Sequence, residues 1–231
     1  MKEQKVWLVT DADSGIGLAL VKMLLWDGYK VAATSRTINK LQLNISENKN
    51  FLPMSVDLTV EACVEEALEK VIKKFGRLDM VVNTTGNIAV ECVEEISNWE
   101  FRQAMDINTF GTVNLIRAVM PSLRNEQSGH IFNFLPFVGY HGTVEAESYS
   151  AIKPTVVSYS ETLAEEVKPL GIKVTIVETD YLSDNFTYRD SLQDNFDKLA
   201  AAFLDAAESD DPPAYLLLDD VRMASPNVGQ L

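Results

Sequence analysis

Tyr149 and Lys153 stand four residues apart in the run Tyr-Ser-Ala-Ile-Lys, a spacing that could support acid–base chemistry. Residues four apart share one face of a helix. A lysine ammonium close to a phenol lowers the pKa of the tyrosine, which can then donate or accept a proton near neutral pH. Ordinary pairs on a helix surface show the same spacing, so the chemical interpretation needs support from residues elsewhere in the chain.

A second candidate is the turn Thr10-Asp11-Ala12-Asp13-Ser14-Gly15-Ile16-Gly17, which follows an apolar run. Glycines after the first strand of an α/β fold allow the backbone to approach a pyrophosphate, whose charge is held at a helix N-terminus. We therefore expect a dinucleotide phosphate site here. The alternative is that Gly15 and Gly17 only permit close packing between a helix and the sheet.

The elements that must position these residues alternate as in βαβ units. The expected strands are 6–10, 29–35, 52–56, 78–83, 129–134 and 172–177, and the expected helices are 16–26, 60–75, 99–123 and 148–170, with a weak helix around Leu41. Segment 183–197 is polar without a clear period, 198–207 predicts an amphipathic helix, and 214–218 could be a seventh strand. We expect one domain over 1–231, with a core at 5–180 and a lid and tail at 181–231. Its fold class is α/β, a single doubly wound parallel sheet with helices on both faces and ligand at the carboxyl ends of the strands.

Composition limits the partners. Acidic residues outnumber basic ones by 34 to 20, a net charge of −14, which argues against nucleic acid and anionic membrane surfaces. No apolar run reaches the roughly 18 residues of a bilayer span, and no early signal segment is present, so we expect a cytoplasmic protein. The two cysteines and two histidines form no metal-ligand cluster, so no metal site is expected.

The glycine turn, Tyr149 and Lys153, together with Asn108 in the run Met-Asp-Ile-Asn-Thr-Phe-Gly, resemble the motifs of the short-chain dehydrogenase/reductase family. The resemblance runs from about residue 6 to at least residue 180. It implies a Rossmann-type fold and hydride transfer between a nicotinamide dinucleotide and a carbonyl or secondary alcohol. It also implies that Tyr149 transfers the proton, that Lys153 lowers the tyrosine pKa and holds the ribose, and that Asn108 completes a relay through water.

The cofactor contacts follow from the same resemblance. Arg36 ends the second strand, where a basic side chain can pair with the 2′-phosphate of NADP. No acidic residue occupies that strand end to bind a free ribose, so NADP(H) is favoured over NAD. The alternatives are a solvated surface arginine for Arg36 and a helix cap for Asp57. The implied cofactor-binding residues are Thr10, Ser14, Gly15, Ile16, Gly17, Arg36, Asp57, Asn83, Gly86, Tyr149 and Lys153.

One position of the glycine turn and one position of the catalytic motif depart from the family pattern. Asp11 replaces the first glycine of the turn, and it adds both a Cβ and a carboxylate near the expected diphosphate. Pro136 stands thirteen residues before the tyrosine, where the family has the serine that polarises the carbonyl. Tyr140 or Thr143 could supply another hydroxyl.

After the sixth strand, Asp180 and Asp184 stand where the family has a glycine and a threonine against the nicotinamide. With Asp11, three carboxylates would weaken the binding of a polyanionic cofactor. We therefore expect an NADP(H)-dependent oxidoreductase with weak or impaired activity on a small-molecule carbonyl or alcohol. The alternative is a non-catalytic protein of the same fold that serves in binding, regulation or protein interaction. In the family, helices 99–123 and 148–170 pack against their copies, so we expect a homodimer or homotetramer.

Overall fold

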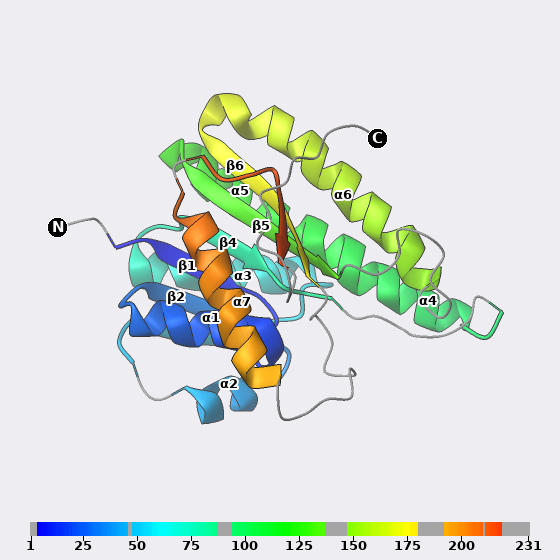
Figure 1. The fold of residues 1–231 in the computed structure, drawn as a ribbon, viewed down its shortest axis with the longest axis horizontal. Coiled ribbons are helices and arrows are strands. Elements are labelled where there is room, and N and C mark those ends of the chain that lie inside the picture. The colour runs from blue at the N-terminus through cyan, green and yellow to red at the C-terminus, as the bar shows by residue number, and fades with distance from the viewer. Residues whose placement is uncertain are drawn as a thin grey trace.

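A computed structural model of the chain describes residues 4–45, 48–86, 94–136, 147–179, 192–209 and 211–218. Its centre is a sheet of seven parallel strands in the order β3-β2-β1-β4-β5-β6-β7 (Figure 1). Ligands bind to such sheets where the strand order reverses, here between β1 and β4. The strands are β1 (Val6–Val9), β2 (Lys30–Ser35), β3 (Phe51–Ser55), β4 (Met80–Asn83), β5 (Gly129–Pro136), β6 (Ile172–Thr179) and β7 (Tyr215–Leu218).

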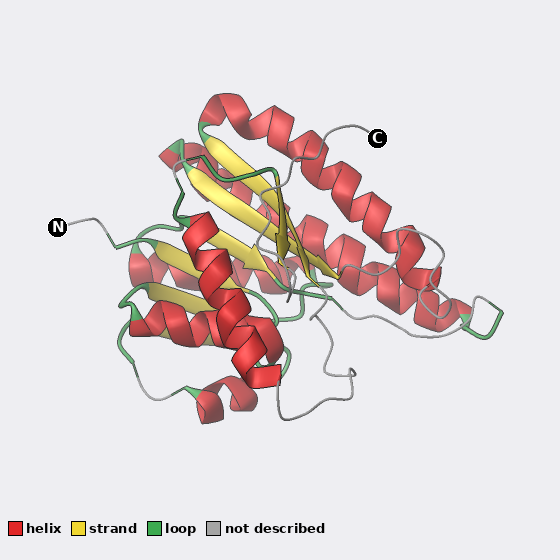
Figure 2. Cartoon of the chain, viewed as in Figure 1, coloured by secondary structure: helices red, strands yellow, loops and turns green. Residues whose placement is uncertain are grey.

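Helices cover both faces of the sheet (Figure 2). One face packs against α1 and α7, whose Leu20 and Phe203 belong to the same apolar cluster. The other packs against α3, α5 and α6, which contribute Val71, Val119 and Leu163 to a second cluster. The predicted fold class is therefore confirmed. The helices are α1 (Gly15–Trp26), α2 (Ile38–Asn44), α3 (Glu61–Phe75), α4 (Asn98–Met105), the π segment η1 (Asp106–Phe110), α5 (Gly111–Glu126), α6 (Glu147–Val167), the 3-10 turn η2 (Lys168–Leu170) and α7 (Leu192–Ala207).

The strands were predictable because both faces of a parallel sheet are buried. In β1 the side chains alternate between the two clusters: Val6 and Leu8 face one layer of helices, and Trp7 and Val9 face the other. All four are buried. An uninterrupted apolar run is therefore the expected sequence of such a strand.

Two helices differ from the sequence expectation. The helix expected at 99–123 is divided into α4, η1 and α5, because five residues from Asp106 adopt the wider π geometry. The helix expected from 198 begins at Leu192 instead. Its first turns are mostly polar, but Phe196 is buried in the same apolar cluster as Leu199, and this contact extends the helix toward its N-terminus. The possible seventh strand is present as β7, parallel to β6.

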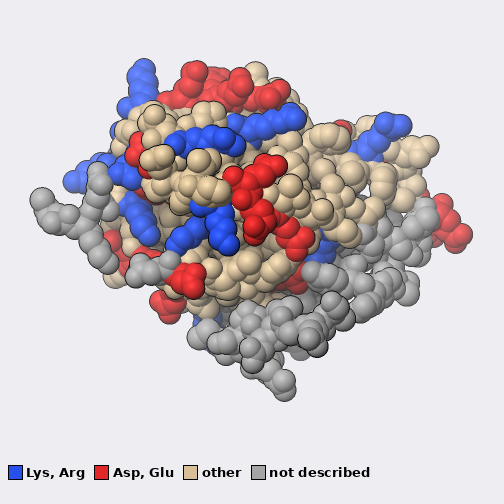
Figure 3. Space-filling model, turned by 90° about the horizontal axis from the view of Figure 1, so that it is seen from above, with Lys and Arg blue, Asp and Glu red and all other residues tan. Residues whose placement is uncertain are grey.

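Charges of both signs are present on one face of the described part of the molecule (Figure 3). On the face shown in Figure 3, acidic and basic side chains lie interspersed over the surface. Among the helices in the described part of the chain, none combines the length and the apolar character that a membrane crossing requires.

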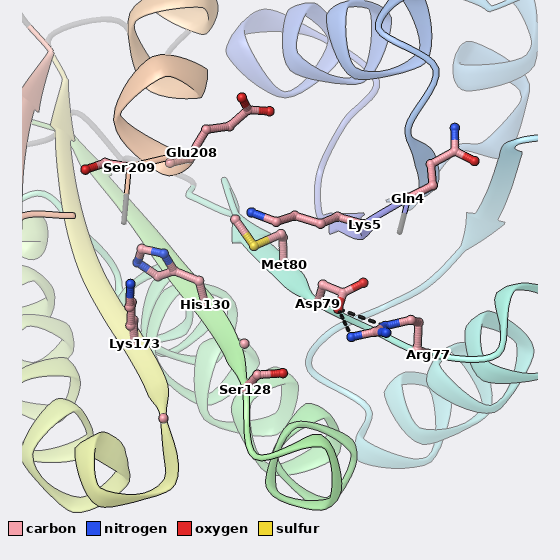
Figure 4. A pocket seen from close by; sticks show the side chains of 13 residues that line it. Gln4, Lys5, Arg77, Asp79, Met80, Ser128, His130, Lys173, Glu208 and Ser209 are labelled. Atoms are coloured by element: carbon pink, nitrogen blue, oxygen red, sulfur yellow. Dashed lines mark hydrogen bonds and ion pairs between the residues drawn. The ribbon is translucent and has the colours of Figure 1, made fainter. Parts of the chain in front are cut away.

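His130 is buried at the amino end of β5. A cavity of about 380 Å³ opens there, at the amino ends of the strands and away from the glycine turn, which follows the carboxyl end of β1 (Figure 4). The His130 Nε2–H donates to Thr175 Oγ1 over 2.8 Å, because the Thr175 hydroxyl gives its own proton to the carbonyl oxygen of Pro213. Burial, together with the nearby charges of Lys173 and Lys5, lowers the pKa of His130 to about 3. The ring is therefore neutral in the folded protein.

Acid should destabilise the fold through His130. The ring has an ordinary pKa of 6.5 and a folded value of about 3, so between these values the unfolded chain binds more protons. The stability that the neutral ring contributes is thus lost as the pH falls through this window. Between pH 7 and pH 5 this residue should remove about 2 kcal/mol from the free energy of unfolding. Urea unfolding of the wild type and His130→Gln at both pH values measures the effect, and an equal loss in both proteins would contradict it.

Candidate active site

The turn after β1 keeps the backbone shape of a glycine turn although its first glycine is replaced. Asp11 has φ 47° and Gly15 has φ 54°, both in the left-handed region that favours glycine. Aspartate tolerates this region better than most residues. A Cβ on Gly17 would lie 3.0 Å from Thr84 Oγ1 and 3.1 Å from the Asp11 carbonyl oxygen, so a side chain there would force the turn apart.

The N-terminus of α1 is suited to an anion. Ser14 is its N-cap, but the serine side chain makes no capping hydrogen bond, and the first turn holds no acidic residue. The first N–H groups of a helix lack partners within the helix and carry a partial positive charge. Asp13, just before the helix, accepts a hydrogen bond from Ser35 Oγ at 2.8 Å and pairs with Lys40 at 3.7 Å. These contacts hold its carboxylate toward β2 and α2.

Beside this turn, a cavity of about 200 Å³ brings together three of the predicted cofactor residues, Arg36, Asp57 and Gly86. Arg36 is exposed. Asp57 Oδ1 accepts hydrogen bonds from Thr59 N (2.9 Å) and Thr59 Oγ1 (2.7 Å), so this carboxylate braces the loop before α3. Asp11 lines the same cavity, which places the substituted residue next to the predicted ligand contacts.

The carboxyl ends of β1, β4 and β5 are joined by buried hydrogen bonds centred on Asn83. Its Oδ1 accepts from Thr10 Oγ1 at 3.0 Å, and its Nδ2 donates to Thr112 Oγ1 at 2.9 Å and to Asn133 Oδ1 at 3.3 Å. Asn133 Nδ2 in turn donates to Ser160 Oγ of α6 at 2.9 Å. Thr10 and Asn83, both predicted to touch the cofactor, thus also hold the frame of the site.

Thr112 and Ser160 were missed by the sequence analysis. Both are buried hydroxyl residues on the sheet-facing side of helices. The sequence indicates Thr112 and Ser160 in one way: each is a polar residue at a position where the helical period calls for an apolar residue. Ile16, by contrast, was predicted to contact the cofactor, and its buried side chain belongs to the apolar cluster under α1.

Asn108 lies buried in the π segment between α4 and α5. Its side-chain Nδ2 donates to the backbone carbonyl oxygen of Ala104 at 2.7 Å, and the backbone carbonyl oxygen of Asn108 accepts from Thr112 Oγ1 at 2.8 Å. A Cβ on Gly86 would lie 3.6 Å from Asn108 Oδ1, so the loop after β4 passes close to this amide. Single π turns inside α-helices often occur at functional sites.

Lys153 projects from α6 into the protein and is almost completely buried, with 1% of its surface exposed. Its Nζ lies 3.5 Å from Oε1 of Glu178, a buried residue of β6. None of the sequence motifs assigns a role to Glu178. The signal was available, because a carboxylate is rarely found within a strand that is otherwise buried on both faces.

Tyr149 falls within α6, one helical turn before Lys153, as the spacing predicted. Pro136 ends β5, where its register partner in β6 is Thr179. The side chains of Tyr149 and Pro136 lie outside the described part of the structure. Four further residues of the sequence-based expectations, Tyr140, Thr143, Asp180 and Asp184, also lie outside the described residues.

Comparison with known proteins agrees with this geometry. A family model described as short chain dehydrogenase matches residues 5–193. Oxidoreductase BOA17 of Botryotinia fuckeliana is 34% identical over 176 residues, which cover 75% of this chain and 64% of that protein. A 3-ketodihydrosphingosine reductase of Bacteroides thetaiotaomicron is 35% identical over 185 residues, 80% of this chain and 66% of that protein. The matches thus span about two thirds of the length of these two relatives.

Two solved structures are similar over most of their length. A short-chain dehydrogenase from Streptomyces avermitilis is 29% identical with a TM-score of 0.83, covering 94% of this chain and 88% of the other. A 3-ketoacyl-(acyl-carrier-protein) reductase from Brucella melitensis, complexed with NADH, is 25% identical with a TM-score of 0.80, covering 94% and 97%. The chain belongs to the short chain dehydrogenase family.

Replacing Asp11 with glycine should stabilise the fold, whereas alanine should not. Both substitutions remove the carboxylate, but only glycine adopts the φ of 47° without steric cost. We expect Asp11→Gly to exceed Asp11→Ala by about 1 kcal/mol in the free energy of unfolding, measured in urea. Equal stabilities would show that the turn carries no such strain.

Proposed function

We propose that this chain is an NADP(H)-dependent oxidoreductase that transfers a hydride between a nicotinamide and a carbonyl or secondary alcohol, with weak activity. The observation that carries the proposal is the cavity at the carboxyl ends of the strands, which Arg36, Asp57 and Gly86 line and beside which Asn108 is buried. Relatives named as reductases of keto groups support a carbonyl substrate. They also favour an enzyme over the non-catalytic alternative.

The described residues fit a dinucleotide. The space that a Cβ on Gly17 would need is already filled, so the turn is closed tightly under the N-terminus of α1. That helix terminus, without acidic residues, would receive the pyrophosphate. Arg36 would lie at the adenosine end of the ligand. When bound, the nicotinamide would donate or accept the hydride.

The protein's own residues would manage the proton. Tyr149 would transfer it to or from the substrate oxygen, and Lys153 on the next turn of α6 would lower the pKa of the phenol. The π segment would hold the Asn108 side chain beside the loop at Gly86, where it could order a water for proton exchange with solvent.

Two substitutions account for the weak activity in this proposal. Loss of one hydrogen bond to the polarised oxygen, as expected with Pro136 in place of a serine, lowers a rate by about 10²–10³. The Asp11 carboxylate would repel a phosphate about 5 Å away by roughly 1 kcal/mol per charge pair in water, and by more where water is excluded. The first effect acts on turnover and the second on cofactor affinity.

Arg36 should determine the preference between the two cofactors. Its guanidinium can pair with the 2′-phosphate of NADPH, which NADH lacks. We expect Arg36→Leu to weaken NADPH binding by at least about tenfold and to change NADH binding by less than about twofold. Calorimetric titration measures both affinities. The control is Arg124→Leu, which replaces an exposed arginine in the last turn of α5, near the end of the sheet where the strands begin. A wild type that binds NADH more tightly than NADPH would contradict the assignment.

Repairing the turn and the polarising position together should raise turnover. Asp11→Gly removes a repelling charge, and Pro136→Ser supplies a hydroxyl. The two should be more than additive, because the hydroxyl acts only when the cofactor is bound. With NADPH and a panel of activated ketones or quinones, the double variant should exceed the parent by at least about tenfold.

Tyr149→Phe in the double variant is the control, and it should abolish the gain. A double variant that binds NADPH tightly yet stays inert would contradict the proposed lesion and direct attention to segment 181–197. Brisk turnover by the unmodified chain would contradict the claim of weak activity.

The homodimer or homotetramer stays a prediction, and so does the cytoplasmic location. Both are part of this proposal. Thr155, Ser158 and Thr162 are exposed along one side of α6. Short side chains of this kind would let two helices approach closely across a two-fold axis.

A further inference from the structure

Glu178 and Lys153 form an ion pair in a part of the protein from which water is largely excluded. Lys153 is 1% exposed and Glu178 is 7% exposed, with 3.5 Å between Nζ and Oε1. Ile152, next to Lys153 in α6, and Ile176, two residues before Glu178 in β6, belong to one apolar cluster. Charges interact strongly in such surroundings because few solvent dipoles screen them.

Stability alone does not explain this pair. The cost of removing two charges from water often equals or exceeds their attraction, and apolar residues of similar size commonly serve as well. The lysine has a role in the proposed chemistry, since its positive charge would lower the pKa of Tyr149. A carboxylate at 3.5 Å acts against that effect.

We propose that Glu178 is a positioning residue that acts through Lys153: its carboxylate offsets the ammonium charge, and so sets both the pH range in which Tyr149 exchanges a proton and the strength with which the site holds a dinucleotide. The inference rests on the proposed function for the roles of Tyr149 and Lys153. It adds a residue that none of the sequence motifs contains.

The direction of the effect is given by the net charge of the pair. With both groups ionised, the pair has a net charge of zero. In Glu178→Gln, a charged Lys153 leaves a net charge of +1, which lowers the pKa of a neighbouring phenol and attracts phosphate. If burial made the lysine neutral, the net charge would return to zero. The glutamine amide oxygen can still accept a hydrogen bond from the ammonium, which favours the charged lysine.

Other charged groups on the elements around α6 are placed differently. Glu100 forms a capping box with Ser97 at the start of α4, and Glu161 of α6 accepts a hydrogen bond from the Tyr215 hydroxyl. Lys173 stands at the far end of β6, beside His130. The remaining charged residues of α4 and of the π segment are Arg102, which is exposed, and Asp106, which is half-buried.

The test is an ultraviolet titration of the phenolate, which requires no activity. Each protein is measured with and without Tyr149→Phe, so that the difference isolates Tyr149 from the other tyrosines. We expect Glu178→Gln to lower the apparent pKa of Tyr149 by about one unit and to tighten NADPH binding about fivefold. Glu178→Asp, which keeps the carboxylate, should titrate like the wild type. Glu126→Gln, which removes an exposed carboxylate from the last turn of α5, is the control for net charge.

A second pair of variants keeps the test decisive if Glu178→Gln does not fold. Lys153→Met alone leaves Glu178 and should raise the pKa of Tyr149, and addition of Glu178→Met should return it toward the wild-type value. A Tyr149 titration that is unchanged in a folded Glu178→Gln protein, or the absence of this return, would overturn the proposal.

The outcomes also separate this inference from the proposed function. A shifted titration in a protein that binds no NADPH would support the role of Glu178 and count against the oxidoreductase assignment. Turnover with NADPH and an unshifted titration would support the oxidoreductase assignment and overturn the role of Glu178.

Discussion

Hydrogen bonding of the Asn83 amide is the constraint on which the candidate site depends. Both polar atoms of this side chain are used, toward β1, β5 and α5, in a region closed to solvent. A buried polar group that loses its partner costs about 1–3 kcal/mol. Removal of the amide would leave Thr10, Thr112 and Asn133 each short of a partner. The carboxyl ends of three strands are thereby held in one arrangement.

This dependence separates the frame of the site from its lining. Asp11 comes directly after Thr10 yet lines the cavity, and Pro136 comes three residues after Asn133 at the end of β5. The hydrogen bonds described around Asn83 run to Thr10, Thr85, Thr112 and Asn133. The lining can therefore change its charge and its hydroxyl groups while the strands keep their register, which is why the chain retains the fold of its family with altered chemical groups.

The sequence predicted the sheet well because each buried parallel strand needs a continuous apolar run, as in β1. It also predicted that Arg36, Asp57 and Gly86 would come together, because the carboxyl ends of parallel strands lie at the same end of the sheet. It could not predict the pairing of Lys153 with Glu178, since these residues are 25 positions apart and meet only through the packing of α6 on β6. The early start of α7 was missed for a related reason, because one tertiary contact of Phe196 outweighs the polar character of its neighbours.

The π segment allows the helical stretch from α4 to α5 to pack against two different apolar clusters. Ala104 and Leu115 are eleven positions apart in the sequence, so an unbroken α-helix would place them within about 20° of each other around its axis. Here Ala104 packs with Ile152 of α6, whereas Leu115 belongs to the cluster that contains Val71 of α3. A π turn is equivalent to one inserted residue and rotates the next stretch of helix by about 100°. Deletion of a single residue at this point would leave the chain helical but turn one of these two faces toward solvent.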